Sequence, residues 1–239
     1  MDGAADFRIA GHRDIWKILT CHLDHDLLKE TDARFGGGTL ASMRHGEYRE
    51  SIDVDFLLCK SRPFSAVKGQ VRSITDLKLV REPVVEKDAV RLWVEYEGRT
   101  VKVEFILEQR FTFGSPDNFC GINALNDMDL MACKLFAYSD RSIYAARPGK
   151  DISDILAVFR KYPEVMFPAC MTVYAAYGSW FAEALKRLYA AEEGFLKDIL
   201  ASAGISDPYI KILAETAPGL KAEIRRIIQE IEKQETFER

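Results

Sequence analysis

The sequence predicts an α+β protein in which an α/β domain over residues 1–120 is followed by a helical domain over residues 121–239. Two observations predict this division. Apolar and polar residues alternate in several segments up to about residue 107, as in half-buried strands. From about residue 123 onward, apolar residues instead recur at spacings of three and four, as on one face of a helix. The pattern changes near residues 119–123, where we place the domain boundary.

The composition is that of an ordinary folded protein, with 48% hydrophobic and 29% charged residues and a formal net charge of −4. It excludes disordered and collagen-like classes, and the charge argues against a surface that binds polyanions throughout. The first residues lack the regions of a signal peptide, and no apolar run approaches the roughly 20 residues that cross a bilayer. Five cysteines without a Cys-x-x-Cys pair favour a reducing compartment. We therefore expect a cytoplasmic protein that does not enter a membrane.

The first 75 residues predict a helix, a glycine-rich turn, a strand and a second helix, in that order. Apolar residues at helical spacing predict the first helix over residues 15–27, and residues 35–40 form a turn that contains three glycines. Residues 51–58 alternate between apolar and polar side chains and predict a half-buried strand. After Pro63, apolar residues spaced by three and four predict the second helix, up to residue 74.

The next segment predicts a β-hairpin. Residues 90–96 and 101–107 are two alternating runs rich in β-branched residues, and they flank a turn that contains Gly98. We expect the strands to end here. Beyond residue 123, the spacing of the apolar residues predicts that the C-terminal half is helical throughout.

Three carboxylates lie on the predicted strands. Asp53 and Asp55 are two residues apart, so both side chains leave the same face, opposite the apolar residues. Two like charges at this spacing repel each other unless a divalent cation such as Mg²⁺ neutralises them. Glu104, on the hairpin, also points away from its apolar neighbours and would complete a cluster of three carboxylates, an arrangement that holds two metals. The alternative is that Asp53 and Asp55 simply form the solvated face of an amphipathic strand.

A second signal lies upstream, in the run Gly36-Gly37-Gly38-Thr39-Leu40. The glycines allow the backbone to approach a ligand closely, and the N–H groups at the start of a following helix suit a phosphate. The run is not a Walker loop, because no Gly-Lys-Ser/Thr follows, and it is not the spaced glycine fingerprint of dinucleotide-binding proteins. It is informative because a strand with an Asp-x-Asp pair follows it.

Two sequence blocks together resemble the nucleotidyltransferase superfamily that has the DNA polymerase β-like palm. They are the glycine-rich run and Arg49-x-Ser51-x-Asp53-x-Asp55-Phe56. Within that superfamily the chain is similar to the AbiEii/AbiGii toxin family, whose later motifs match Lys102-Val103-Glu104-Phe105, Asp129-x4-Lys134, Arg141 and Lys150-Asp151-Ile152-x-Asp154-Ile155. The resemblance covers roughly residues 30–160. Related enzymes more often have Asp at the position of Glu104.

The resemblance implies a nucleotidyltransferase palm with a mixed sheet, a C-terminal helical domain, and an active site between them. It implies that a nucleoside monophosphate is transferred from an NTP to an acceptor hydroxyl, with Mg²⁺ or Mn²⁺ as cofactor and pyrophosphate as leaving group. Glu104 would also be the base for the acceptor hydroxyl. The implied metal ligands and catalytic residues are Asp53, Asp55 and Glu104, and the implied nucleotide-binding residues are Gly37, Gly38, Thr39, Arg49, Ser51 and Lys134.

The resemblance also implies a biological role. Such a protein acts as a toxin of a toxin–antitoxin or phage abortive-infection system, modifies an RNA such as tRNA, and is restrained by a separate antitoxin protein. Two alternatives remain open at this point. One is a nucleotidyltransferase that modifies a small antibiotic, and the other is an inactive module that binds a nucleotide without turnover. Lys134 would bind the donor triphosphate, or it would be an ordinary solvated residue on its helix.

Overall fold

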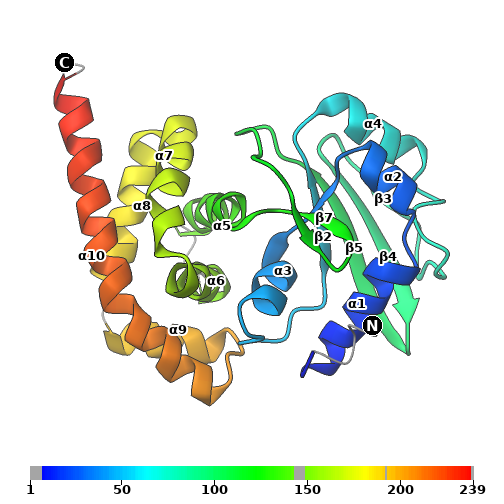
Figure 1. The fold of residues 1–239 in the computed structure, drawn as a ribbon, viewed down its shortest axis with the longest axis horizontal. Helices are drawn as coiled ribbons and strands as arrows, with labels where there is room; N and C mark the ends of the chain where they lie inside the picture. The colour runs from blue at the N-terminus through cyan, green and yellow to red at the C-terminus, as the bar shows by residue number, and fades with distance from the viewer. Residues whose placement is uncertain (1–6, 143–148, 192, 238–239) are drawn as a thin grey trace. The chain divides into compact units, whose positions relative to one another are not determined.

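The computed structural model describes residues 7–142, 149–191 and 193–237. The chain divides into two compact units, which we call the sheet unit, Met1–Asn126, and the helical unit, Asp127–Arg239 (Figure 1). The sheet unit is drawn from blue to green, and the helical unit from green to red. The α+β class predicted from the sequence, with a mixed sheet and a helical C-terminal half, is confirmed.

A seven-stranded sheet organises the first unit, in the order β3-β4-β5-β2-β1-β7-β6. The strands are β1 (Arg34–Phe35), β2 (Val54–Leu58), β3 (Val84–Val85), β4 (Ala89–Tyr96), β5 (Arg99–Leu107), β6 (Asp117–Phe119) and β7 (Ile122–Ala124). β2 pairs with β5 and β1 pairs with β7 in parallel, whereas the other pairs are antiparallel. The sheet is therefore mixed, and β2 lies at its centre.

The predicted hairpin is confirmed as β4 and β5. Its turn residues Glu97 and Gly98 have φ values of +47° and +74°. Two consecutive positive φ values are the geometry of the tight hairpin turns that match the twist of the strands. The expectation that the strands end at residue 107 is wrong, because β6 and β7 follow. These strands have three residues each, and the two-residue β3 is shorter still, so their alternation is too brief to predict a strand.

Four helices of the sheet unit are α1 (Ala10–Cys21), α2 (His25–Glu30), α3 (Gly37–Arg44) and α4 (Ser61–Gly69). The single helix expected over residues 15–27 is thus two helices. The chain breaks at Asp24, whose side chain accepts a hydrogen bond of 2.9 Å from the backbone N–H of Leu27 and caps α2. The preceding Leu23 forms a β-bridge with Thr75. The helix expected to reach residue 74 ends at Gly69, and the strand expected from residue 51 begins at Val54.

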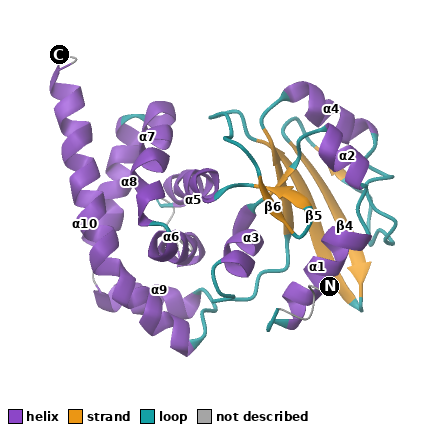
Figure 2. Cartoon of the chain, viewed as in Figure 1, coloured by secondary structure: helices purple, strands orange, loops and turns teal. Residues whose placement is uncertain are grey.

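The two faces of the sheet carry different side chains. Phe35, Phe56 and Phe105 are fully buried and form a row on one face, with ring centroids 6.0 Å and 5.1 Å apart along the row. Successive residues of a strand point to opposite faces, so Asp55 and Leu57 lie on the other face. Figure 2 shows α3 on one side of the strands and α1, α2 and α4 on the other. A Cβ built on Gly36, which precedes α3, would lie 2.5 Å from Leu57 Cδ1, so α3 begins on the carboxylate face.

The helical unit contains α5 (Asp127–Arg141), α6 (Gly149–Lys161), α7 (Met166–Tyr177), α8 (Ser179–Ala190), α9 (Glu193–Ser202) and α10 (Asp207–Phe237). Its core is formed by apolar residues at the spacings that predicted the helices, such as Ile155, Phe181 and Ile227, all fully buried. Among the residues that the structure describes, no helix combines the length and the apolar character needed to cross a membrane.

Candidate active site

The site begins where the chain leaves β1 and enters α3. The backbone N–H of Gly36 donates a hydrogen bond of 2.8 Å to the carbonyl oxygen of Asp55. Gly37 has a φ of +71°, and a Cβ built on it would lie 2.9 Å from Asp55 Cγ and would overlap the carboxylate oxygen Oδ2. A side chain at residue 37 is therefore excluded by both the backbone conformation and the contact. Gly37 and the half-exposed Gly38 thus place the first turn of α3 against Asp55.

A row of charged residues crosses the sheet next to this turn. Asp55 of β2 is the register partner of Glu104 of β5, and Glu104 is the register partner of Arg91 of β4. These three side chains therefore share one face of the sheet. Asp53 immediately precedes β2, and its side chain is 52% exposed, against 18% for Asp55 and 10% for Glu104. The row thus runs from solvent into a partly buried position, where uncompensated charge is costly.

Lys102 brings the three carboxylates together. Its Nζ lies 2.7 Å from Glu104 Oε2, 3.5 Å from Asp53 Oδ2 and 3.8 Å from Asp55 Oδ1. Burial lowers the pKa of Lys102, but the hydrogen bond to Glu104 and the charges of the two aspartates outweigh burial and raise it above its usual value. Lys102 is therefore an ammonium ion in the centre of the carboxylates.

Glu104 has a second cationic partner. Arg91 Nε donates a hydrogen bond of 2.5 Å to Glu104 Oε1, and Arg91 also lies 3.0 Å from Glu86 Oε2. The hydrogen bond to Glu104 is the main reason that the pKa of Arg91 is raised. Both oxygens of Glu104 are thus engaged, Oε1 by Arg91 and Oε2 by Lys102.

The donor atoms around Lys102 Nζ suit a hard divalent cation, because they are carboxylate oxygens that already converge on one positive charge. Within the described ranges, however, no group of three or more His, Cys, Asp or Glu side chains is arranged to hold a metal. In the cluster, the Glu104 carboxylate accepts hydrogen bonds from the Lys102 ammonium and the Arg91 guanidinium. Asp53, Asp55 and Glu104 fit a metal chemically, and their role as its ligands stays a prediction.

The loop before β2 is fastened to α3 by hydroxyl groups. Thr39 Oγ1 donates a hydrogen bond of 2.9 Å to Ser51 Oγ, and Ser42 Oγ donates one of 2.6 Å to the carbonyl oxygen of Arg49. Thr39 and Arg49 are buried, and the Arg49 guanidinium lies 5.9 Å from the centre of the Tyr48 ring. These contacts hold the loop against α3. They do not test whether Thr39, Arg49 and Ser51 bind a nucleotide, and that role remains a prediction.

A buried histidine also contacts this loop, and no motif in the sequence indicates it. His12 of α1 is fully buried, and its Nδ1 lies 2.8 Å from Glu47 Oε1. The backbone N–H of Ser51 donates to His12 Nε2 at 3.4 Å. Burial lowers the pKa of His12 below its usual value, an effect larger than the opposing effect of Glu47. Neutral His12 therefore donates from Nδ1 to Glu47 and accepts at Nε2 from Ser51.

Lys134 belongs to the helical unit. Its Nζ lies 2.7 Å from Asp154 Oδ2, with side-chain exposures of 9% and 1%. Arg141 pairs with Asp151 between the same two helices, α5 and α6. Lys134 is therefore a buried ion-pair partner and not a solvated residue, and its action on the triphosphate remains a prediction. Asp154 lies in a sequence motif that matches the family, but the motif alone does not predict a role for this residue.

The sequence offered a signal for Lys102 but not for its partners. The alternation Lys102-Val103-Glu104 places Lys102 on the same strand face as Glu104. Its contact with Asp53 and Asp55 depends on the parallel pairing of β2 with β5. That pairing joins segments far apart in the sequence and cannot be predicted from local periodicity.

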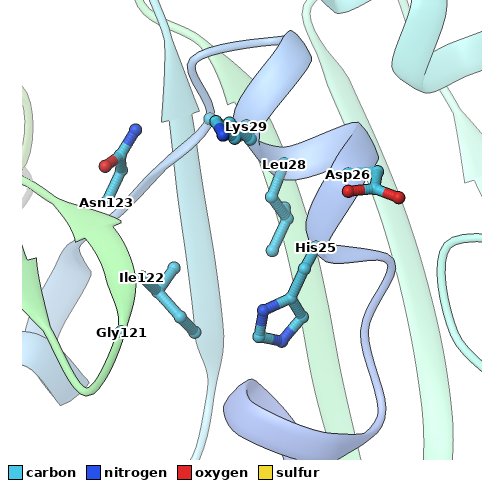
Figure 3. Close-up of a pocket in the computed structure, with 8 residues that line it drawn as sticks. His25, Asp26, Leu28, Lys29, Gly121, Ile122 and Asn123 are labelled. Carbon is cyan, nitrogen blue, oxygen red and sulfur yellow. The ribbon is translucent and has the colours of Figure 1, made fainter.

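A separate pocket of about 360 Å³ lies between α2 and the β6–β7 hairpin (Figure 3). Figure 3 shows His25 and Leu28 of α2 opposite Ile122, whereas the Asp26 side chain points away from it. His25 Nε2 lies 2.9 Å from the carbonyl oxygen of Leu19. None of the residues that line this pocket is a predicted site residue.

The chain matches one protein-family model and resembles solved structures in fold. The family model described as "Nucleotidyl transferase AbiEii toxin, Type IV TA system" matches residues 17–236. No curated protein matches the chain. A solved structure from H. pylori, provisionally described as a nucleotidyltransferase, is 17% identical, with a TM-score of 0.52 and coverage of 98% of each chain. The structure of JHP933 from Helicobacter pylori is 18% identical, with a TM-score of 0.52 and coverage of 99% of this chain and 96% of that one. These likenesses concern the fold.

Proposed function

The chain belongs to the AbiEii family of nucleotidyltransferase toxins of type IV toxin–antitoxin systems, and from this we propose that it transfers a nucleoside monophosphate from an NTP to a hydroxyl group of an RNA such as tRNA. One observation carries the proposal. Three carboxylates from β5 and from the start of β2 surround one cation beside the first turn of α3. The carboxylates can bind a metal cation, and the N-terminus of α3 beside them suits a phosphate.

Different residues of the sheet unit have different proposed roles in binding the phosphates and the metal. The N–H groups in the first turn of α3 have no partners within the helix, so Gly37, Gly38 and Thr39 offer donors to the phosphates of the NTP. The absence of side chains at the two glycines lets the phosphates approach the backbone. Asp53, Asp55 and Glu104 would hold Mg²⁺ or Mn²⁺, which would neutralise the triphosphate and the departing pyrophosphate when bound. Glu104 is also the proposed base for the acceptor hydroxyl.

Lys134 is proposed as a further residue that binds the triphosphate. An ammonium ion is a compact charge suited to phosphate oxygens. Its ion pair with Asp154 fixes the direction of its side chain. The assignment follows from the match of Asp129-x4-Lys134 to the family motif.

RNA is the proposed acceptor because α6 carries exposed cations at Lys150, Arg160 and Lys161. Such residues contact phosphates of a nucleic acid without reading its sequence. A cationic aminoglycoside would be repelled by the same residues. A toxin of this family works with a separate antitoxin protein, and NTP and tRNA are cytoplasmic, so we place this protein and its antitoxin in the cytoplasm.

The experiment follows label from an NTP into an acceptor. Purified protein is incubated with each α-labelled NTP and Mg²⁺ or Mn²⁺, together with tRNA, other RNA, an aminoglycoside, or no acceptor. Label should enter RNA, and Asp53→Asn should abolish the transfer while the protein remains folded. Label in the aminoglycoside would indicate an antibiotic-modifying enzyme, and NTP binding without label transfer would indicate an inactive module.

A matched control distinguishes the site from its surroundings. Glu95 lies on the same face of β4 as Arg91 but pairs with the exposed Lys78 at 2.8 Å. The Glu95→Gln variant also removes one negative charge from this face of the sheet. It should transfer label at the wild-type rate, because Glu95 lies outside the carboxylate cluster.

A further inference from the structure

Lys102 stands where the carboxylate cluster concentrates its negative charge. Its Nζ is within 3.8 Å of all three carboxylates, and its side chain is 27% exposed. We propose that Lys102 is an internal counter-cation, which occupies the cation position of the site until a divalent metal displaces it. This inference rests on the proposed function, in which the same carboxylates bind the metal.

The charges of the cluster explain why displacement is needed. Asp53, Asp55 and Glu104 carry three negative charges, and Lys102 and Arg91 carry two positive charges. A divalent cation that entered with Lys102 in place would meet an ammonium at contact distance from its own ligands. Repulsion between cations only a few ångströms apart is strong in a partly buried site. The metal therefore gains most from the carboxylates when the ammonium leaves.

Of the two cations that bind Glu104, Lys102 is the one that can be displaced, because Arg91 is held by more contacts. Arg91 holds Glu104 Oε1 at 2.5 Å and is also fixed by Glu86 at 3.0 Å. In the part of the chain that the structure describes, Lys102 forms ion pairs only with the three carboxylates of the cluster and has no second anchor outside it. A lysine ammonium on a flexible stem also moves more readily than a guanidinium held by two carboxylates.

The incoming nucleotide supplies a destination for Lys102. A triphosphate carries several negative charges and would lie against the first turn of α3, next to Asp55. Lys102 can then exchange its carboxylate partners for phosphate oxygens without losing its charge. Metal and nucleotide would therefore load together, and the nucleotide-free protein would bind a divalent cation weakly. This coupling protects the protein from binding metal unproductively in the absence of a donor.

The test measures binding of Mn²⁺ alone, by the loss of the electron paramagnetic resonance signal of free Mn²⁺, in the full chain without nucleotide. Lys102→Met should bind Mn²⁺ roughly tenfold more tightly than wild type or better, because a neutral side chain no longer competes. Lys102→Gln, which retains a hydrogen-bond donor for Glu104, should show the same gain. Lys102→Arg should bind as weakly as wild type.

Two control variants attribute the gain to the cluster. Lys78→Met removes a lysine–glutamate pair of similar length, 2.8 Å, from the exposed surface and should bind Mn²⁺ like wild type. Adding Asp55→Asn to Lys102→Met should remove the gained affinity. Thermal unfolding gives a second readout: Mn²⁺ should raise the unfolding temperature of Lys102→Met more than that of wild type.

Unchanged or weaker Mn²⁺ binding in both folded variants, Lys102→Met and Lys102→Gln, would overturn the inference. The label-transfer assay on wild type separates this result from failure of the proposed function. Wild-type transfer together with unchanged Mn²⁺ affinity in the variants would reject the counter-cation and keep the enzyme. Tighter Mn²⁺ binding in a chain that transfers no label would keep the counter-cation and reject the activity.

Discussion

Gly37 and Asp55 are in direct contact, and the contact depends on the absence of a side chain at residue 37. A Cβ on Gly37 would lie 2.9 Å from Asp55 Cγ, and the glycine has a φ of +71°. The N–H of Gly36 binds the carbonyl oxygen of Asp55 at 2.8 Å. The helix that is proposed to bind the triphosphate is thus fixed to the strand that carries a proposed metal ligand.

Gly37→Ala should therefore damage the site beyond its effect on stability. The positive φ alone costs an alanine roughly 1–2 kcal/mol. The new Cβ would additionally push the Asp55 carboxylate away from Lys102 and the start of α3. We expect a loss of stability of about 2–3 kcal/mol and a large loss of label transfer, measured by denaturant unfolding and the transfer assay.

Gly98→Ala is the matched control for this prediction. Gly98 has a similar φ of +74°, but nothing lies within 4 Å of a Cβ built there. The variant should lose stability through the backbone term alone and retain wild-type transfer. Equal activity losses in the two variants would show that the contact between Gly37 and Asp55 does not matter for the reaction.

The stability of the sheet unit should depend on pH through His12. Burial lowers the pKa of His12 below its usual value of 6.5. As the pH falls below about 6.5, the unfolded chain binds a proton that the folded chain does not, so the free energy of unfolding decreases. The decrease continues until the pH reaches the lowered pKa of the folded state. Measurements above pH 5 avoid the titration of Glu47. Burial raises the pKa of Glu47, but the N–H donors of Arg8 and Ile9 and the His12 ring bind its carboxylate and lower the pKa below its usual value.

His12→Gln should be less stable than wild type at pH 8, because Gln cannot reproduce both ring contacts. It should also lose part of the decrease between pH 7 and 5, as measured by urea unfolding. An identical pH dependence in His12→Gln and wild type would contradict this account of His12.

Lys134→Ala should affect both stability and nucleotide use. Asp154 is 1% exposed, so removal of the ammonium 2.7 Å away leaves a buried charge with less compensation. We expect a loss of about 3 kcal/mol in the free energy of unfolding. The same substitution should raise the KM for NTP or lower turnover without changing the apparent affinity for RNA.

Arg141→Ala provides the comparison, because Arg141 pairs with Asp151 between the same two helices. It should lower stability and leave the kinetics with NTP unchanged. If Lys134→Ala instead weakened only RNA binding, in a salt-dependent manner, Lys134 would belong to the acceptor surface.

The long, regular patterns of the sequence predicted the fold best. The alternation in β4 and β5 and the helical spacing after residue 127 were sufficient to predict the hairpin and the helical half. Periodicity does not predict the break between α1 and α2, because tertiary and capping contacts override it there. The bridge between Leu23 and Thr75 and the cap by Asp24 divide one expected helix into two.

The site was predictable only in part, for a physical reason. Alternation shows which face of a strand a carboxylate occupies, so it related Asp53 to Asp55. It does not show which strands are neighbours, and the parallel pairing of β2 with β5 brings Lys102 to the two aspartates. His12 lies 39 residues before Ser51, and no local pattern relates an isolated histidine in a helix to a distant loop.

The most direct test of the central claim is the rate of nucleotide transfer to RNA by Asp55→Asn, at saturating NTP and Mg²⁺, with the unfolding midpoint measured on the same preparation. Asp55 contacts Gly37 and lies in the carboxylate cluster, so its charge is proposed to act in the reaction itself. The account predicts a loss in kcat on the order of a thousandfold, with a folded protein and with Glu95→Gln as active as wild type. An Asp55→Asn protein that transferred nucleotide at a rate within a few fold of wild type would contradict the assignment of this cluster as the catalytic site.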